Sequence, residues 1–227
     1  MMIYSNLKKQ KGKKRRGVIA FIMGSDVGGF YDLANQYWKL KSHSDRIVDN
    51  INNFADIIAY LNNAKNKPLF NKPWGEINII VHGSEFGAYM PVGSGSSRNT
   101  TYRALLSAIN DETIKALPDT IVDEKTNINL HGCEIGKAGK LLKLISIAFG
   151  GQDKKAPKVF APKLPIGYEQ KSGRPVTEIL EPEFWVVIPK KNPAKAIKTF
   201  KSKYSWLPAR QKKKFKGKNI TWDKVGY

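Results

Sequence analysis

The sequence predicts an α/β protein, a three-layer sandwich with a mainly parallel sheet of about six strands and helices on both faces. Short apolar runs rich in β-branched residues alternate along the chain with longer stretches of helical period. Strands that alternate with helices are typical of a parallel sheet covered on both sides. With 227 residues and 41% hydrophobic residues, the chain can bury a large core.

The expected elements follow one another in a regular order. The strands are short apolar runs, at Val18–Met23, Arg46–Val48, Ile77–Val81, Ile128–Leu130, Val159–Phe160 and Phe184–Ile188. The helices have apolar residues three or four positions apart, at Phe30–Leu40, Phe54–Leu61, Tyr102–Ile109 and Gly139–Phe149. Asparagines before the second helix can cap it, and a glycine pair ends the fourth. A Gly- and Ser-rich loop over 83–97 follows the third strand.

The net charge of +20 lies almost entirely at the two ends of the chain. Residues 1–16 hold seven Lys and Arg and no acid, and residues 190–227 hold thirteen against one acid. This leaves 19 basic and 18 acidic residues over 17–189. We therefore expect a basic N-terminal arm (1–16), a central domain (17–189) and a basic, aromatic-containing C-terminal arm (190–227).

Basic arms suit contact with a polyanion, such as nucleic acid or an acidic surface. The candidate contacts are Lys8, Lys9, Lys13, Lys14, Arg15, Arg16, Lys212, Lys213 and Lys214. Aromatic residues lie among the C-terminal lysines, and these side chains either dock on the domain or stack on bases. The alternative is a pair of solvated arms that only raise solubility.

The chain has one cysteine, which excludes an intramolecular disulfide and any multi-cysteine zinc site. A single thiol is typical of a reducing compartment, so we expect a cytoplasmic protein, with non-classical export as the alternative. The apolar run 18–23 is shorter than the roughly 7 to 15 residues of a signal-peptide core. No run approaches the roughly 20 apolar residues of a membrane-spanning helix, so no transmembrane segment is expected.

Two expected strands end at residues able to perform acyl-transfer chemistry. The third strand ends before His82, Gly83 and Ser84, and the fourth ends shortly before Cys133. The carboxyl ends of parallel strands meet at one edge of the sheet, where ligands bind in α/β proteins. If these strands are neighbours, His82 and Cys133 share one crevice.

A thiol and an imidazole placed together suit nucleophilic catalysis. A cysteine is mostly protonated at neutral pH, and His82 can take its proton and return it to a leaving amine. Main-chain N–H groups at Gly83 and Cys133 can stabilise an oxyanion. Alone, Cys133 suits a core position and His82 a loop cap, but their joint placement favours a catalytic dyad. This chemistry requires no metal or organic cofactor.

The two motifs, Ile80-Val81-His82-Gly83-Ser84 and Leu130-His131-Gly132-Cys133-Glu134-Ile135-Gly136, resemble those of the caspase-like superfamily of cysteine peptidases. That superfamily includes caspases, metacaspases, gingipains, clostripain, separase and bacterial caspase-like domains. The resemblance covers roughly 18–188 in strand order and is specific only around the two motifs. It implies that Cys133 is the nucleophile, His82 the general base and Gly83 an oxyanion donor. It also implies a cysteine endopeptidase whose substrates are proteins or peptides.

In such peptidases a pocket at the end of the first strand holds the substrate residue before the cleaved bond. Here that position is Gly24-Ser25-Asp26, so the resemblance implies that Asp26 and Ser25, with Ser84, contact the substrate. Asp26 would then select Lys or Arg. Its alternative role is to cap the helix that begins near Phe30.

Three other functions have weaker support. An α/β-hydrolase needs a G-x-S-x-G elbow after a strand, which residues 93–97 do not provide. A nucleotide-binding P-loop needs a spacing that residues 136–140 lack. The main alternative is a non-catalytic α/β domain whose basic arms bind nucleic acid or another polyanion.

Overall fold

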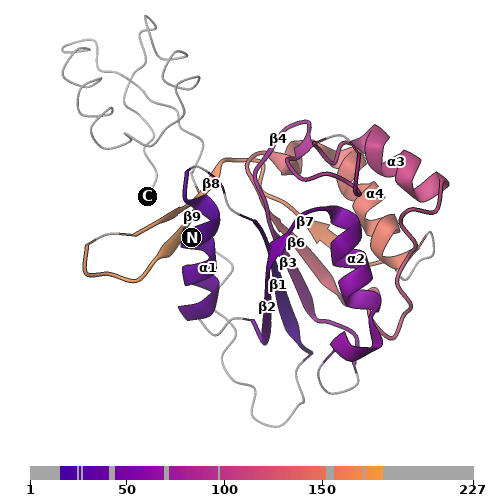
Figure 1. Cartoon of the computed structure of the whole chain (residues 1–227), viewed down its shortest axis with the longest axis horizontal. Helices are drawn as coiled ribbons and strands as arrows, with labels where there is room; N and C mark the ends of the chain where they lie inside the picture. Colours follow the sequence, from indigo (N-terminus) through magenta and orange to yellow (C-terminus); the bar gives the residue numbers. More distant parts are fainter. Residues whose placement is uncertain are drawn as a thin grey trace, which may run out of the picture. The chain divides into compact units, whose positions relative to one another are not determined.

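The computed structural model describes residues 16–180 apart from 25, 27, 41–43, 69–71, 97, 152–155 and 171. Its centre is a five-stranded parallel sheet with the strand order β2-β1-β3-β6-β7 (Figure 1). The sheet strands are β1 (Val18–Met23), β2 (Arg46–Ile51), β3 (Glu76–Ile80), β6 (Asn127–His131) and β7 (Lys158–Phe160). The predicted α/β class and parallel sheet are therefore confirmed. The sixth predicted strand, 184–188, lies outside the described residues.

Helices cover both faces of the sheet (Figure 1). They are α1 (Phe30–Leu40), α2 (Phe54–Asn62), α3 (Tyr102–Asn110) and α4 (Gly139–Gly150), and short 3₁₀ turns occur at η1 (Ala64–Asn66) and η3 (Ile135–Lys137). Each helix lies in the chain between two parallel strands, because a parallel pair cannot be closed by a tight turn.

The local sequence explains where these helices begin and end. Asn53 caps α2, since its side-chain oxygen accepts a hydrogen bond from the Asp56 amide at 2.9 Å. Thr101 caps α3 in the same way. Gly151 follows α4 with a positive φ of 78°, which costs glycine little. The predicted cap and glycine stop are confirmed.

The two faces of the sheet have different cores. One face packs against α2, α3 and α4 in a large hydrophobic cluster that includes Phe21, Ile79 and Leu105. The other face packs against α1 in a smaller cluster rich in aromatic residues, including Tyr37 and Trp38. We call these the apolar face and the α1 face.

Two short antiparallel hairpins were not predicted from the sequence. The first, β4 (Gly83–Ser84) with β5 (Gly87–Ala88), lies within the expected loop after β3. The second, β8 (Ile166–Glu169) with β9 (Thr177–Leu180), lies on the α1 face of the sheet. Its turn contains Gly173, which has a φ of 70°.

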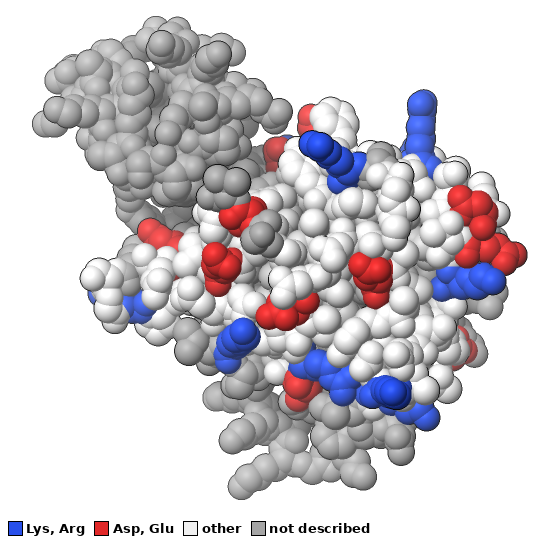
Figure 2. All heavy atoms as spheres, viewed as in Figure 1, with Lys and Arg blue, Asp and Glu red and all other residues white. Residues whose placement is uncertain are grey.

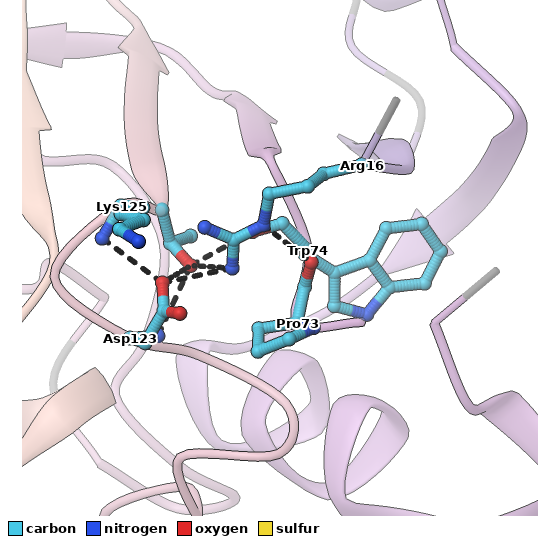
Figure 3. Close-up of polar contacts among 6 residues, drawn as sticks. Arg16, Pro73, Trp74, Asp123 and Lys125 are labelled. Atoms are coloured by element: carbon cyan, nitrogen blue, oxygen red, sulfur yellow. Dashed lines mark hydrogen bonds and ion pairs between the residues drawn. The ribbon is translucent and has the colours of Figure 1, made fainter. Parts of the chain in front are cut away.

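Arg16 belongs to the folded domain, although the charge pattern assigned it to the basic N-terminal arm (Figure 3). Its guanidinium donates to Asp123 Oδ1 at 2.8 Å and to the Pro73 carbonyl at 2.9 Å. Asp123 and Thr126 precede β6, so this network ties the start of β1 to that of β6. Arg16 is therefore engaged within the domain through Asp123, and its role as a polyanion contact stays a prediction.

The pKa of Asp123 is lowered below its ordinary 3.8. Partial burial raises it, but the Arg16 guanidinium and the Lys125 amide, which both bind the ionised carboxylate, outweigh that effect. Because the folded-state pKa is depressed, this group contributes stability above pH 3.8 that is lost as the pH falls through the lower folded value.

The other eight candidate polyanion contacts, in 8–15 and 212–214, lie outside the described residues. On the face shown in Figure 2, acidic and basic side chains of the described part are interspersed. No helix within the described ranges is both long enough and apolar enough to span a membrane.

Candidate functional site

His82 and Cys133 follow the ends of two neighbouring strands. The register of β3 and β6 pairs Ile80 with His131, and the Val81 amide donates to the His131 carbonyl at 3.1 Å. Side chains alternate across a sheet, so residues 82 and 133 lie two positions further along on the face of Ile80, which is the α1 face. His82 contacts α1 and Cys133 contacts β8, which both lie on that face.

Two glycines let the chain segments after β3 and β6 lie against each other. A Cβ on Gly83 would lie 2.5 Å from Ile135 Cδ1 and 3.2 Å from the Cys133 carbonyl oxygen. A Cβ on Gly132 would lie 2.5 Å from the Val81 carbonyl oxygen. Gly83 therefore lies beside Cys133, and the space of its absent side chain is filled by Ile135.

The chain turns sharply directly after Cys133. Glu134 has a φ of 59°, in the left-handed region that costs a non-glycine residue roughly 1–2 kcal/mol. Its amide donates to the Leu164 carbonyl at 3.2 Å, and its side chain pairs with Lys137. Strained residues of this kind concentrate at functional sites, although strain alone does not identify one.

The His82 ring is held by residues that follow β1. Its Nε2 lies 2.7 Å from Asp26 Oδ2. The ring packs against Phe30, with centroids 4.4 Å apart, and against Tyr31, with centroids 4.9 Å apart. The His82 side chain is 37% exposed, so solvent or a substrate can still reach it.

Tyr31 also supports the main chain at His82. Its phenol oxygen accepts a hydrogen bond from the His82 amide at 3.0 Å and donates to Met23 Sδ at 3.6 Å. Burial raises the pKa of Tyr31 to about 12; the nearby Asp26 adds to this, and the His82 amide opposes it. The phenol therefore stays neutral at physiological pH and keeps both hydrogen bonds.

Cys133 is partly buried rather than enclosed in the core. Its Sγ donates to the Ile166 carbonyl, at the start of β8, at 3.4 Å. Thiol and imidazole thus lie at one edge of the sheet, where β8 contacts the thiol and the segment after β1 contacts the imidazole.

A buried polar network lies on the same face, within β3 and β6 and before the residues that follow these strands. His131 is 3% exposed, and its Nδ1 lies 2.7 Å from Oε1 of Glu178, which is 7% exposed. Its Nε2 lies 3.1 Å from Asn78 Oδ1, which also accepts from Asn129 at 2.9 Å. Both ring nitrogens therefore lie within hydrogen-bond distance of a side-chain oxygen.

The network continues into the β8–β9 hairpin and α1. Tyr168 donates its hydroxyl proton to Glu178 Oε1 at 3.0 Å and accepts from Trp38 Nε1 at 3.3 Å. Burial, and then the Glu178 charge, raise the pKa of Tyr168 well above 10. The network thus links the hairpin to β6 two residues before Cys133, and His131 has a structural role in it.

The remaining predicted site residues have different surroundings. Asp26 lies beside His82, and its Oδ1 accepts from the Tyr31 amide at 3.4 Å, as the helix-capping alternative predicted. Ser84 is buried, and its hydroxyl oxygen accepts from the Phe86 amide within the β4–β5 turn. Ser84 thus has a structural contact in this turn, and its contact with a substrate stays a prediction. Ser25 lies outside the described residues.

Sequence reasoning missed the pairing of Asp26 with His82 and the pairing of His131 with Glu178. Each joins residues far apart in the chain, by 56 and 47 positions, so no local pattern encodes it. The β8–β9 hairpin did have a signal, because alternating residues flank a Ser172-Gly173 turn.

Comparisons with protein-family models, with curated proteins and with solved structures found no match to this chain. Within the described ranges, no three His, Cys, Asp or Glu side chains form a group able to hold a metal ion.

Proposed function

We propose that this protein is a cysteine endopeptidase that cleaves peptide bonds with Cys133 as nucleophile and His82 as general base. The observation that carries the proposal is the placement of the two residues after neighbouring parallel strands on one face of the sheet. The partial burial of Cys133 and the exposure of His82 further support it, since a substrate must reach both.

The proposed reaction proceeds through a thioacyl-enzyme. His82 takes the thiol proton, and the Cys133 thiolate attacks the carbonyl carbon of the peptide bond. The tetrahedral intermediate collapses by breaking the C–N bond, and His82 gives the proton to the leaving amine. Water then hydrolyses the thioester with His82 again as base. The Gly83 and Cys133 amides are the proposed oxyanion donors.

We further propose that the domain has caspase-like topology, with a sixth strand at Phe184–Ile188. The described part supports this with β1, β3 and β6 adjacent and in the expected chain order. The family resemblance also implies cleavage after Lys or Arg.

The test is peptidase activity of the full chain on a peptide library, with Cys133→Ala and His82→Ala as separate variants. Removal of either residue of an acyl-transfer pair is expected to lower kcat/KM by at least about a thousandfold. Arg103→Ala, an exposed change in α3, is the control and should leave kcat/KM unchanged. Equal activity in Cys133→Ala and the wild type would disprove the proposal.

A second candidate function rests on the charge at the chain ends, where residues 1–16 and 190–227 hold twenty basic residues against one acid. A polyanion-binding domain should bind DNA or RNA with an affinity that falls steeply as salt rises. Cys133→Ala should leave that binding unchanged. Salt-dependent binding without peptidase activity in the wild type would favour this function over catalysis.

A further inference from the structure

The segment between β1 and the first turn of α1 holds His82 through three contacts. Asp26 binds Nε2 at 2.7 Å, the Tyr31 hydroxyl binds the backbone amide at 3.0 Å, and the Phe30 ring packs on the imidazole at 4.4 Å. These groups restrain a ring whose other surface remains open. Such restraint is what a general base needs to keep one nitrogen aimed at its proton.

The Asp26 contact determines which ring nitrogen carries the proton. An ionised carboxylate only accepts hydrogen bonds, so a neutral His82 ring must place its proton on Nε2. Nδ1 then keeps the lone pair. Among the residues that the structure describes, no hydrogen bond engages Nδ1, so it is free to accept the thiol proton.

Both oxygens of Asp26 have partners within the domain. Oδ2 faces His82, Oδ1 accepts from the Tyr31 amide, and the side chain is only 17% exposed. A carboxylate that selects a substrate Lys or Arg must instead present its oxygens to the incoming cation. The contacts of Asp26 therefore favour a role toward His82 over a role toward the substrate.

We propose that Asp26 is a positioning residue: it fixes the Nε2–H form of His82 and makes Nδ1 the nitrogen that takes the Cys133 proton. The inference rests on the proposed peptidase function. It also moves the source of any Lys or Arg selectivity away from Asp26.

The kinetic test compares Asp26→Asn with the wild-type full chain on two peptides that differ only in Lys or Leu before the cleaved bond. The control is Asp32→Asn, an exposed acid in the first turn of α1. We expect Asp26→Asn to lower kcat roughly 10²- to 10⁴-fold on both peptides with little change in KM, because an asparagine amide can donate to Nε2 and favour the wrong tautomer. Asp26→Glu should recover part of the activity.

A loss confined to the Lys peptide, or carried by KM alone, would overturn the proposal and assign Asp26 to specificity. Wild-type kcat in Asp26→Asn on both peptides would also overturn it.

A second measurement does not depend on catalysis. ¹⁵N NMR of the full chain with labelled histidine, assigned through His82→Ala, reports which ring nitrogen of neutral His82 is protonated. We expect Nε2–H in the wild type and in Asp32→Asn, and a shift toward Nδ1–H in Asp26→Asn. If these tautomers are observed but the wild type has no peptidase activity, the proposed function is disproved, and the effect of Asp26 on the His82 tautomer is retained. An unchanged tautomer in folded Asp26→Asn would overturn the orientation itself.

Discussion

The two faces of the central sheet are built from the same strands but bury different chemistry. On the apolar face, Ile77 and Ile79 of β3 pack with α2, α3 and α4 in a large hydrophobic cluster. On the α1 face, Asn78 of the same strand lies in a network with His131 and Glu178. Strand alternation separates the two sets. His82 and Cys133 lie on the second face, beyond the network.

Burial contributes differently to stability on the two faces. An apolar cluster gains free energy from every buried side chain, at roughly 1.5–3 kcal/mol for a large one. A buried ion pair gains little overall, because loss of hydration offsets the attraction between the charges. Local departures from the most stable packing are expected at functional sites. The contrast therefore agrees with a functional role for the α1 face.

The largest expected effect on stability is that of Glu178→Ala, which leaves His131 buried beside an empty space. We expect the free energy of unfolding in urea to fall by about 3–5 kcal/mol, as for other buried pairs that lose one partner. The double change His131→Leu with Glu178→Met should recover part of the loss, because no buried charge remains but the Tyr168 hydroxyl loses its acceptor.

The exposed Glu85→Ala is the control for this experiment. A loss below about 1 kcal/mol in Glu178→Ala, within the range of exposed pairs, would contradict a stabilising buried contact between His131 and Glu178 and remove the contrast between the faces.

Leu105→Ala makes the corresponding change on the apolar face. Leu105 is fully buried in α3, so we expect a loss of about 2–5 kcal/mol in the free energy of unfolding, from lost transfer energy and a residual cavity. The folded fraction should keep wild-type kcat/KM, since α3 contacts the opposite face. Reduced kcat/KM in fully folded Leu105→Ala would show that the faces are not independent.

Gly83→Ala is expected to have a smaller effect on stability and a local effect at the site. The new methyl group would collide with Ile135 and approach the Cys133 carbonyl, at a cost of about 1–3 kcal/mol. Gly167→Ala in β8 is a matched control, because no heavy atom lies within 4 Å of its new Cβ. Equal unfolding free energies and equal Cys133 alkylation rates for the two variants would contradict the close packing of residues 83 and 133.

The sequence predicted β1, β3 and β6 and all four helices within a few residues, because their signals are local. A run such as Ile77–Val81 is apolar enough to indicate a buried strand wherever it lies in the fold. The same reasoning placed His82 and Cys133 at strand ends. Strand β2 continues to Ile51 and is longer than predicted. The prediction stopped at Val48 because Asp49 and Asn50 interrupt the apolar pattern.

The partners of His82 and His131 could not be predicted in this way, and the β8–β9 hairpin was missed although its turn residues gave a local signal. The hairpin lies outside the main sheet, so its pattern did not reveal which surface it covers. No local pattern singles out Glu178, whose carboxylate is buried against His131. Burial of a charged group depends on its partner, which belongs to another part of the chain.

By itself, the order of residues determined the α/β class, the local limits of most elements and the two strand ends that bear a thiol and an imidazole. Each of these follows from short-range spacing of apolar residues and glycines. Only the tertiary structure decided that Asp26 meets His82 across 56 positions of chain. The physical reason is sheet order: β1 lies directly beside β3, so the segment after β1 reaches the residue that follows β3.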